Sequence, residues 1–316
     1  MKKIEAIVHN GLFHIDDVLS VALLRYAFPD VEINVTRTRS DAIIKDKTTN
    51  VDSDTNVFVL DVGLVPFYEN GNVVMIDHHE KDGETYDNGI KMAACGKLFR
   101  YLVQKGYINL PDYVYPEILN MIFYPIESQD NGQTVEDIEL RPNIMSFISM
   151  LNPSWVEDSD GDVEFDKAVE IALLIFKRSI VSIESTPLAN QLTYNAIDVA
   201  NENKVDYIIF DRFCQWQKPV CGHNENCTPD KVINFVIWKG KEANEYFIQA
   251  VPVELNSFIT RIPFPKEYMG KRDEELDEAA GTVNQAVFCH QSGFLSKWKS
   301  LEAALKAADA ARKAQK

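Results

Sequence analysis

The stretch Asn72-Val73-Val74-Met75-Ile76-Asp77-His78-His79 decides how the rest of the sequence is interpreted. Its four consecutive apolar residues fit a short buried strand, and the run ends at an aspartate and two histidines. In open α/β sheets, chemistry commonly sits at the carboxyl ends of parallel strands. Side chains alternate faces along a strand, so only one of the two histidines can easily point into a given site. The alternative is a pair of surface histidines in a loop. The residues that follow the other predicted strands help to decide between a site and this alternative.

The start of the chain repeats this pattern. Residues 4–8 predict a strand that ends at His9, and an apolar stripe over residues 18–26 predicts a helix. His14 and Asp16 lie in the connection between the two. All three polar side chains are therefore expected at one edge of the sheet.

The rest of the first half alternates strands and helices. The predicted strands cover 31–35 and 56–60 and the predicted helices 93–103 and 113–123. The second of these strands ends at Asp61, and the second helix leads to a loop that contains Asp130. This order of elements predicts an α/β fold with a mostly parallel sheet.

Imidazole and carboxylate side chains gather at these strand ends and loops, namely at His9, His14, Asp16, Asp61, Asp77, His78, His79 and Asp130. A set of this size suits two divalent cations, and Mn²⁺ is the expected choice for mixed nitrogen and oxygen ligands, with Mg²⁺ as the alternative. No thiolate belongs to the set, which argues against structural zinc. The sequence therefore predicts a two-metal site.

Composition limits the class of protein. The chain has 316 residues, 46% of them hydrophobic, and a net charge of −16, which indicates a globular protein of two ordinary domains. The negative charge argues against broad clamping of nucleic acid, but metals in an acidic pocket still allow a nucleic-acid substrate. No segment has the ~20 apolar residues that span a bilayer, so no membrane partner is expected.

Five cysteines, an odd number in a long chain, favour a reducing compartment over a disulfide framework. The first predicted strand begins within a few residues of Met1, which leaves no room for a cleavable leader. We therefore expect a cytoplasmic protein, and a homo-oligomer is one possibility that the sequence leaves open.

The second half predicts another domain. Apolar residues at helical spacing over 165–183 lead to Glu184-Ser185-Thr186-Pro187, the preferred domain boundary, which gives domains 1–184 and 185–316. Lys239-Gly240-Lys241 fits a hairpin connection. An alanine-rich helix over 301–311 is expected to pack on the second sheet, whose predicted strands cover 205–210, 232–238, 245–253 and 285–289.

Two groups of side chains in this half invite a functional interpretation. Cys214, Cys221, His223 and Cys227 lack the spacing of a zinc knuckle, so loop and core thiols are the favoured interpretation. Basic residues in an acidic chain suggest contacts to an oxyanion, because arginine binds phosphate bidentately. The candidates are Arg261, Lys266, Lys271, Arg272 and His290, with Arg37 and Arg39 from the first domain.

The motifs together resemble a known family. Asp77-His78-His79 is similar to the signature of the DHH phosphoesterase superfamily, and the closer resemblance is to the Myg family (melanocyte proliferating gene one). The shared motifs run through most of the chain, as His9-Asn10-Gly11-x-Phe13-His14-x-Asp16, Asp61-Val62-Gly63, Asp130-Asn131-Gly132, Leu151-Asn152-Pro153-Ser154-Trp155, Arg261-Ile262-Pro263, Gly270-x-Arg272-Asp273-Glu274 and His290-x-Ser292-Gly293-Phe294.

The resemblance implies a Rossmann-like parallel-sheet catalytic domain, a smaller α+β C-terminal domain that binds substrate, and a two-metal phosphoesterase site. It also implies 3′-to-5′ exonuclease activity on RNA. The positions that match metal ligands of the superfamily are His9, His14, Asp16, Asp61, His78 and Asp130. His79 would lie near the scissile phosphate, and Asp77 would orient a histidine.

The chain departs from the family pattern at a few positions. Asp17 stands where glutamate is common and Ile15 where cysteine is common. Leu295-Ser296-Lys297-Trp298 replaces a Gly-Gly-His-like element. The last difference bears on the substrate pocket and leaves the metal ligands intact.

Three functions are compatible with these residues. The first is metal-dependent hydrolysis of a phosphodiester, with RNA or a short oligonucleotide as substrate and Arg261, Arg272 and His290 as substrate contacts. The second is hydrolysis of a small phosphate compound such as pyrophosphate, which the acidic surface favours. The third is a non-catalytic binding module, which the intact ligand set argues against.

Overall fold

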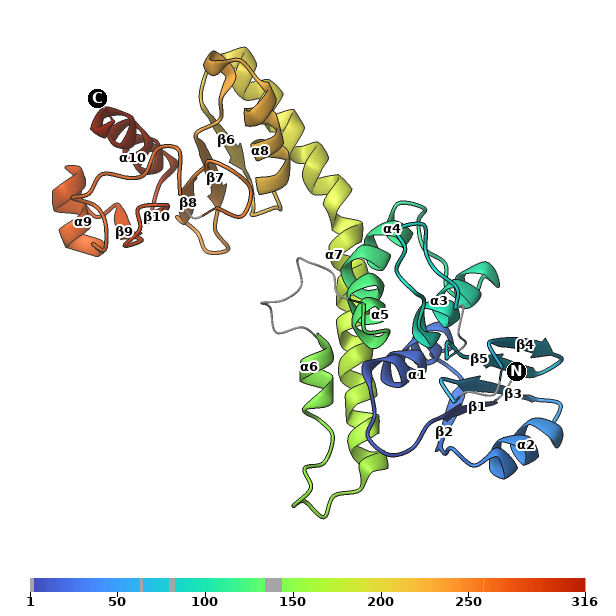
Figure 1. Ribbon diagram of the computed structural model, residues 1–316. Coiled ribbons are helices and arrows are strands. Elements are labelled where there is room, and N and C mark those ends of the chain that lie inside the picture. The colour runs from blue at the N-terminus through green and yellow to red at the C-terminus, as the bar shows by residue number, and fades with distance from the viewer. Residues whose placement is uncertain (1–2, 63–64, 80–82, 134–143, 258, 316) are drawn as a thin grey trace. The chain divides into compact units, whose positions relative to one another are not determined.

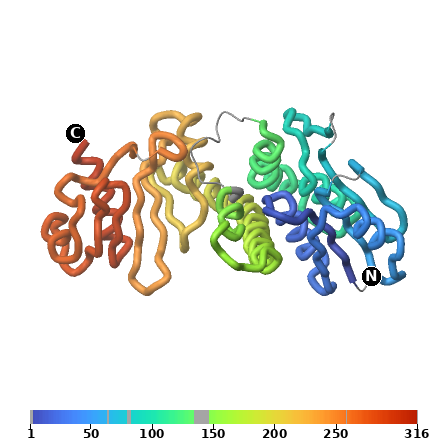
Figure 2. Tube along the Cα trace, turned by 60° about the horizontal axis from the view of Figure 1, so that its bottom comes forward, coloured from blue at the N-terminus to red at the C-terminus, as the bar shows by residue number. Residues whose placement is uncertain are grey.

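The computed structural model describes residues 3–62, 65–79, 83–133, 144–257 and 259–315. Gly63 of the Asp61-Val62-Gly63 motif lies outside these ranges. The chain divides into two compact units, Met1–Glu184 and Ser185–Lys316, coloured from blue to yellow-green and from yellow to red in Figure 2. Each unit has its own sheet and its own core.

The first unit alternates strands and helices along the chain. Its elements are β1 (Lys3–Val8), α1 (Ile15–Ala27), β2 (Glu32–Arg37), α2 (Asp41–Thr49), β3 (Thr55–Leu60), β4 (Phe67–Asn70), β5 (Val73–Ile76), α3 (Ala94–Gln104), α4 (Val114–Ile118), the π-helix η1 (Leu119–Phe123), α5 (Tyr124–Asp130), α6 (Ile144–Ser149) and α7 (Gly161–Asn203).

The sheet of the first unit has the strand order β2-β1-β3-β5-β4. β1 pairs in parallel with β2 and β3, and β5 pairs in parallel with β3. The α/β prediction is confirmed. The edge strand β4, which is antiparallel to β5, was not predicted. All four of its residues are exposed, so it has no alternation of apolar and polar positions to reveal it.

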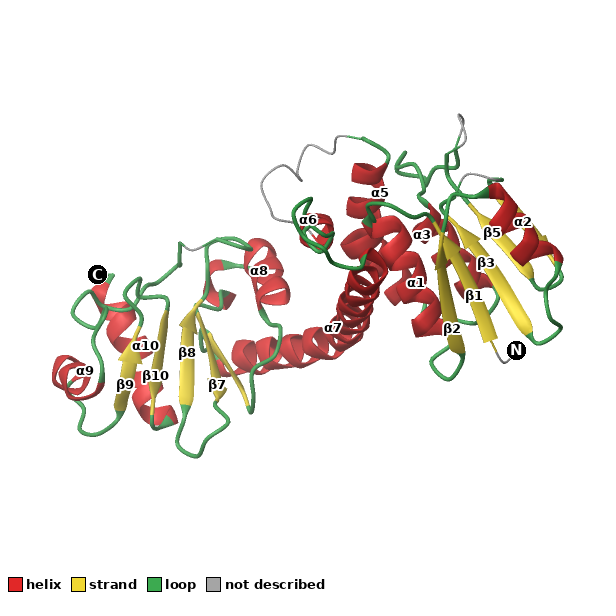
Figure 3. Ribbon diagram, turned by 90° about the horizontal axis from the view of Figure 1, so that it is seen from below, coloured by secondary structure: helices red, strands yellow, loops and turns green. Residues whose placement is uncertain are grey.

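Helices cover both faces of this sheet (Figures 1 and 3). The larger core joins the buried face of α1 to apolar side chains of α3, α5 and the first half of α7. The smaller core joins Ile44 of α2 to Ile7, Val57 and Val59 on the opposite face. Because both faces are buried, β1, β3 and β5 are nearly continuous apolar runs, which is why they could be predicted.

Two helix predictions need correction. The helix predicted to end at Phe123 continues through the π-turn of η1 into α5, so Asp130 is its last residue and not part of a loop. A π-turn accommodates the break in hydrogen bonding that Pro125 causes. The helix expected to stop before Pro187 also continues, as α7, to Asn203. Ile197 and Ala200 of that extension are buried in a core of the second unit.

The second unit has the strand order β6-β7-β8-β10-β9. β6 is parallel to β7 and the other pairs are antiparallel. Leu295–Trp298, which replaces the family's Gly-Gly-His-like element, forms the strand β10 between β8 and β9. The elements are β6 (Tyr207–Phe210), α8 (Gln217–Asn226), the 3₁₀ turn η2 (Pro229–Lys231), β7 (Phe235–Lys239), β8 (Tyr246–Ala250), α9 (Asp273–Ala280), β9 (Ala286–Cys289), β10 (Leu295–Trp298) and α10 (Leu301–Ala314).

Two layers of helices cover this second sheet. The alanine-rich α10 packs on β8 and β10 as expected, with its small side chains in one core. α8 and the last turns of α7 pack on the other face over β6 and β7. No helix in the described ranges is long and apolar enough to cross a membrane.

Candidate metal centre

Three parallel strands deliver polar residues to one edge of the first sheet. His9 follows β1, Asp61 follows β3, and Asp77, His78 and His79 follow β5. Because β1, β3 and β5 run in parallel, their carboxyl ends meet at the same edge. Asp61 has a left-handed backbone (φ 58°), which aspartate tolerates better than most residues and which turns its side chain towards the neighbouring strand ends.

His78 lies at the centre of the cluster. Its Nε2 is 3.4 Å from a carboxylate oxygen of each of Asp16, Asp61 and Asp130. On the other side of the ring, Nδ1 is 3.3 Å from Oδ1 of Asn131. The amide of Asn131 is itself held by the carbonyl oxygens of Lys91 and Glu127. The ring of His78 therefore has a fixed orientation, as metal-bound histidines usually do.

His9 faces a second pair of carboxylates. Its Nδ1 is 3.2 Å from the carbonyl oxygen of Asn10, which places a proton on Nδ1 and the lone pair on Nε2. That Nε2 is 3.3 Å from Oδ2 of Asp17 and 3.5 Å from Oδ2 of Asp61. In the described chain, Nε2 of His9, Oδ2 of Asp17 and Oδ1 of Asp61 are buried without a hydrogen bond. Oδ2 of Asp17 faces Nε2 of His9, and Oδ1 of Asp61 faces the rings of His78 and His79. Cations bound beside these atoms would satisfy them.

Asp16 is held by the N-terminus of α3. Its two oxygens accept hydrogen bonds from the backbone N–H groups of Cys95 (2.6 Å) and Ala94 (3.0 Å). The N–H group of the preceding residue, Ala93, donates to Oε1 of Glu127 (2.8 Å). Two carboxyl groups from distant segments thus replace a local helix cap, because their oxygens accept from N–H groups that have no partner within the helix.

His79 lies at the exposed side of the cluster. Its Nδ1 donates to Oδ1 of Asp77 (2.6 Å) and lies 3.6 Å from Oδ1 of Asp61. The side chain is 59% exposed, unlike the buried His78. Lys97 donates to the carbonyl oxygen of Asp77 (2.8 Å) and fixes the backbone there. Asp77 therefore orients a histidine that faces solvent.

Burial and neighbouring carboxylates shift the pKa values of the residues in this cluster. Burial raises the pKa of Asp16 to about 6, and the charge of Asp61 adds to that rise. Burial and the charge of Asp16 raise the pKa of Asp130 to about 6. Burial opposes the charged form of His78, but Asp61 and the other carboxylates outweigh it and raise the pKa to about 9. Burial lowers the pKa of His9 to about 4, so its imidazole is a neutral ligand at pH 7.

Two groups of side chains have the geometry of metal sites. One is Asp61, Asp77, His78 and His79, and the other is Asp16, His78 and Asp130. Within each group the ligand atoms lie within 4.8 Å of one another. The groups share His78, and the unsatisfied atoms around His9 adjoin Asp61. The residues present therefore fit divalent cations.

The structure brings together nearly all the residues that were predicted as ligands. His14 lies at the rim, exposed, with its ring centroid 5.3 Å from that of His9. Asp16 is the second residue of α1 and not part of a loop. Asp17 was not proposed as a site residue, yet it is fully buried against His9. Its place directly after Asp16 in the first motif was the one available signal.

Asn152 also positions the site. Its side chain accepts from the backbone N–H of Phe13 (2.8 Å) and donates to the carbonyl oxygen of Phe13 (2.9 Å). This pair of bonds fixes the loop between His9 and His14 from a segment about 140 positions away. The Leu151-Asn152-Pro153 motif therefore supports the loop and does not touch the metal ligands.

The two arginines after β2 have different environments. The guanidinium of Arg37 donates to the carbonyl oxygens of Gly11 (2.6 Å) and Gly161 (3.0 Å) and to Asp162, and its side chain is 4% exposed. We therefore do not retain Arg37 as a substrate contact. Arg39 is exposed and has no ion pair in the described residues, and its charge contributes to the low pKa of His9.

The three proposed substrate contacts of the second unit lie at one end of its sheet. Arg261 donates its backbone N–H to Val251 just after β8, and His290 directly follows β9. Arg272 lies opposite Phe288, with its guanidinium carbon 5.8 Å from the ring centroid. All three side chains are exposed. Asp273, Glu274 and Glu275 follow Arg272 in the sequence, but no ion pair to Arg272 is found in the described part of the chain.

The zinc alternative finds no support in the described residues. Cys221 is buried, and Cys214 packs against the core that α8 forms with the sheet. His223, in α8, bonds to the carbonyl oxygen of Lys231, and the thiol of Cys227 bonds to that of Asn224. Both groups with metal-site geometry lie in the first unit.

The fold and the site define an α/β protein with a candidate divalent-metal centre at the carboxyl edge of a parallel sheet. Residues 5–311 match the MYG1 exonuclease family model, described as an uncharacterised protein family, UPF0160. The chain belongs to this family, which confirms the resemblance to the Myg family.

Relatives in several organisms match along nearly the whole chain. The MYG1 protein of Dictyostelium discoideum is 26% identical over 96% of this chain and 95% of its own. The MYG1 protein of Saccharomyces cerevisiae is 27% identical over 93% and 91%. The MYG1 exonuclease of Rattus norvegicus is 27% identical over 96% of this chain and 83% of its own length.

Proposed function

We propose that this protein is a metal-dependent exonuclease that removes nucleotides from the 3′ end of RNA. The supporting observation is the pair of ligand groups that share His78, together with the unsatisfied buried atoms of His9, Asp17 and Asp61. The names of the rat and human relatives, MYG1 exonuclease, point to the same class of reaction. The cluster also fits membership of the DHH superfamily, which we retain as part of this proposal.

The proposed ligands are His9, His14, Asp16, Asp61, His78 and Asp130. Two divalent cations, Mn²⁺ in preference to Mg²⁺, would supply a Lewis acid for the phosphoryl oxygens and acidify a water molecule. Without cations, Asp16 and Asp130 bind protons more tightly than usual, so these protons and the cations compete for the same oxygens.

The remaining polar residues orient the reactants. Asp77 keeps a proton on Nδ1 of His79, which turns Nε2 of this exposed ring towards a substrate phosphate. Arg39 lies on the same edge without a carboxylate partner among the described residues and can contact a phosphate bidentately. Arg261, Arg272 and His290 in the second unit are the proposed contacts for the rest of the strand.

A substrate screen tests the proposal. Purified protein should shorten a 5′-labelled RNA in single-nucleotide steps and release a 3′-labelled nucleotide at once, with Mn²⁺ or Mg²⁺ present. Exhaustive chelation, confirmed by elemental analysis, should stop the reaction without unfolding the chain, because cores of this size do not require a metal. Added Mn²⁺ should restore activity better than Ca²⁺, which prefers sites of oxygen ligands alone.

Hydrolysis of a small phosphate compound is the second candidate. The first unit carries almost all of the negative charge of the chain, which disfavours a long polyanion and favours a compact substrate. Phosphate release from pyrophosphate, without release of nucleotides from RNA or dinucleotides, would establish this candidate. Absence of metal-stimulated hydrolysis on every substrate would instead indicate a binding module.

A further inference from the structure

The edge strand β6 (Tyr207–Phe210) pairs only with β7 (Figure 1). The carbonyl oxygen of Asp206 accepts from the N–H of Phe235 (3.2 Å), so residues 206, 208 and 210 turn their backbone groups towards β7. Backbone groups alternate sides along a strand, and those of Tyr207 and Ile209 therefore point away from the sheet. Within the described residues nothing bonds to these outward groups.

The other sheet edges are covered or charged. Residues 270–272 lie along β9, where Gly270 donates to Cys289 (3.1 Å) and Cys289 donates to Lys271 (3.0 Å). β4 contains Glu69, which bonds to Lys105 and Tyr101, and β2 begins with Glu32 and ends with Arg37. β6 has the sequence Tyr-Ile-Ile-Phe, without charge, proline or bulge. Natural proteins rarely leave such an edge unpaired.

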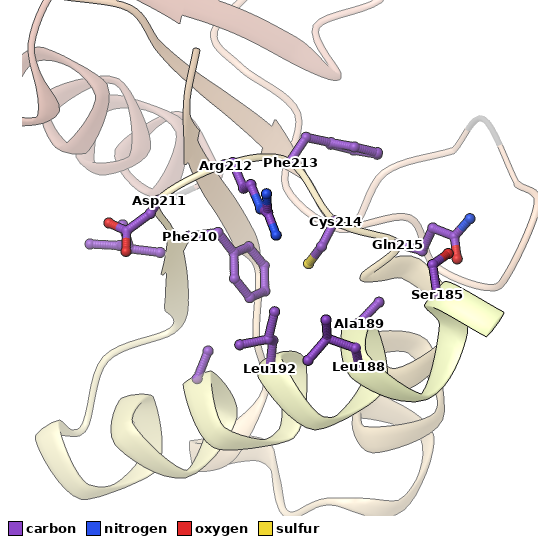
Figure 4. A pocket seen from close by; sticks show the side chains of 12 residues that line it. Ser185, Leu188, Ala189, Leu192, Phe210, Asp211, Arg212, Phe213, Cys214 and Gln215 are labelled. Carbon is purple, nitrogen blue, oxygen red and sulfur yellow. The ribbon is translucent and has the colours of Figure 1, made fainter. Parts of the chain in front are cut away.

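Two grooves accompany this edge. One, of about 710 Å³, lies between residues 185–196 of α7 and residues 209–215, and the other, of about 600 Å³, lies between the last turns of α7 and residues 205–209. Figure 4 shows Leu188, Leu192 and Phe210 lining the first groove, with Arg212 and Cys214 pointing into it. Ile209 and Leu192 are 42% exposed, Leu188 54% and Phe213 59%. The surface around β6 is thus apolar and offers room for the side chains of a further strand.

We propose that β6 pairs antiparallel with β6 of a second copy of this chain, about a two-fold axis at Ile209. A two-fold interface requires a surface that complements itself. A short apolar strand with outward backbone groups meets this requirement, because two identical strands in antiparallel order exchange the same hydrogen bonds. The pairing joins two five-stranded sheets into one.

The charged residues that flank β6 favour one register of the two paired strands. Only the outward-facing residues Tyr207 and Ile209 can exchange hydrogen bonds, so each must lie opposite itself or opposite the other. With Ile209 opposite itself, Arg212 lies opposite Asp206 of the second copy and Phe213 lies opposite Val205. A pairing of Tyr207 with Ile209 would instead place Arg212 opposite Lys204. A pairing of Tyr207 with itself would place Phe210 opposite Lys204, which directly follows α7 and has a left-handed backbone (φ 56°) that does not fit a strand.

Arg212 and Asp206 are suited to this contact. Arg212 is exposed and has no ion pair in the described part of the chain. The carboxylate of Asp206 already accepts from Arg312 and Asn234 but remains 26% exposed, so its exposed side can face a further guanidinium. The aromatic and aliphatic side chains around the strand would be covered in the same step.

The oligomeric state tests the proposal. Light scattering on the full chain at ~50 µM should give twice the chain mass of 35.9 kDa. Ile209→Lys should halve this mass, whereas the control Ile259→Lys, at a residue 70% exposed in the same unit, should not. A wild-type monomer, or a folded Ile209→Lys dimer, would overturn the proposal.

A cysteine pair tests the register and does not depend on the lysine variant. Residues that exchange hydrogen bonds across antiparallel strands have Cα atoms ~5.5 Å apart, within the range of a disulfide. Ile209→Cys should therefore form a covalent dimer on mild oxidation, while Tyr207→Cys and the wild type, with its own five thiols, should not. Cross-linking of Tyr207→Cys in place of Ile209→Cys would refute this register.

Discussion

The two units carry equal numbers of basic residues but very different numbers of acidic ones. Residues 1–184 contain 16 lysines and arginines and 31 aspartates and glutamates, and residues 185–316 contain 16 and 17. The first unit also buries Asp16, Asp17, Asp61, Asp77 and Glu127, whereas the second, in its described part, buries Asp277 alone. The excess acid is therefore not confined to the surface.

The buried carboxylates differ in how well they are satisfied. Oδ1 of Asp277 accepts from Thr282 (2.5 Å), Ala286 (3.0 Å) and Gln285 (3.1 Å). Burial alone would raise its pKa, but these hydrogen bonds lower it below the usual value. Asp61 retains a buried oxygen without a bond. A satisfied carboxylate supports a loop, and an unsatisfied one among histidines is prepared for a cation.

Asp61→Asn tests the carboxylate whose buried oxygen lacks a hydrogen-bond partner and should have the largest effect. Asparagine tolerates the left-handed backbone of this position, so the fold should persist while kcat/KM falls at least about 1,000-fold, or about 4 kcal/mol. Without metal the variant should be no less stable, because the charge of Asp61 raises the pKa of Asp16. Steady-state kinetics and urea unfolding in chelator measure both effects. Full activity in a folded variant would refute the metal assignment.

Glu127→Gln tests another buried carboxyl group of the first unit through the pH dependence of the free energy of unfolding. Burial raises the pKa of Glu127 from 4.5 to about 8. A raised folded-state pKa gives stability that is complete below pH 4.5 and is lost as pH rises towards 8. The free energy of unfolding of the wild type should therefore fall relative to that of the variant, by up to about 1.4 kcal/mol per pH unit over this range. Parallel curves for the two chelated proteins would show that Glu127 is ionised in the folded state.

Asp277→Ala tests the satisfied carboxylate. Its loss removes three hydrogen bonds in the second unit and should lower the free energy of unfolding by about 1–2 kcal/mol, as loss of a cap does. Hydrolysis per folded molecule should not change, because Asp277 lies in the other unit from the ligands. Calorimetry measures the change in stability and steady-state kinetics measures hydrolysis, both on the same sample.

Arg39→Gln should have the smallest effect. An exposed guanidinium that contacts a phosphate should raise KM about tenfold, or about 1.4 kcal/mol, while the thermal midpoint stays constant. Arg37→Gln is the matched control, because that guanidinium is bound to Gly11, Gly161 and Asp162. The control should lower the midpoint instead. Equal KM values for wild type and Arg39→Gln would remove Arg39 from the site.

Sequence patterns revealed the elements whose signal is local. β1, β3 and β5 are apolar runs that end in polar residues, so both the strands and the ligand positions behind them could be predicted. α2 has a single buried residue, Ile44, and a nine-residue segment with one buried position lacks a stripe. Such elements are determined by the neighbours they cover.

The site details that were missed depend on distant contacts. Arg37 could not be assigned from sequence, because its partners Gly161 and Asp162 lie more than 120 positions away. Asp17 accepts from the N–H of His14 at the start of α1, and only the approach of His9 shows its second contact. Which of two adjacent acids faces a site is decided by the packing of the helix and not by its sequence.

The N-terminus of α3 has a consequence for how the protein matures. Ala93 offers no side-chain cap, and within the described residues the N–H groups of Ala93, Ala94 and Cys95 bond to the side chains of Glu127 and Asp16. Those partners are separated from α3 by 78 and 34 positions, so the helix end cannot be completed before the chain has brought the three segments together. Folding of α3 against these segments therefore also positions Asp16, one of the proposed ligands.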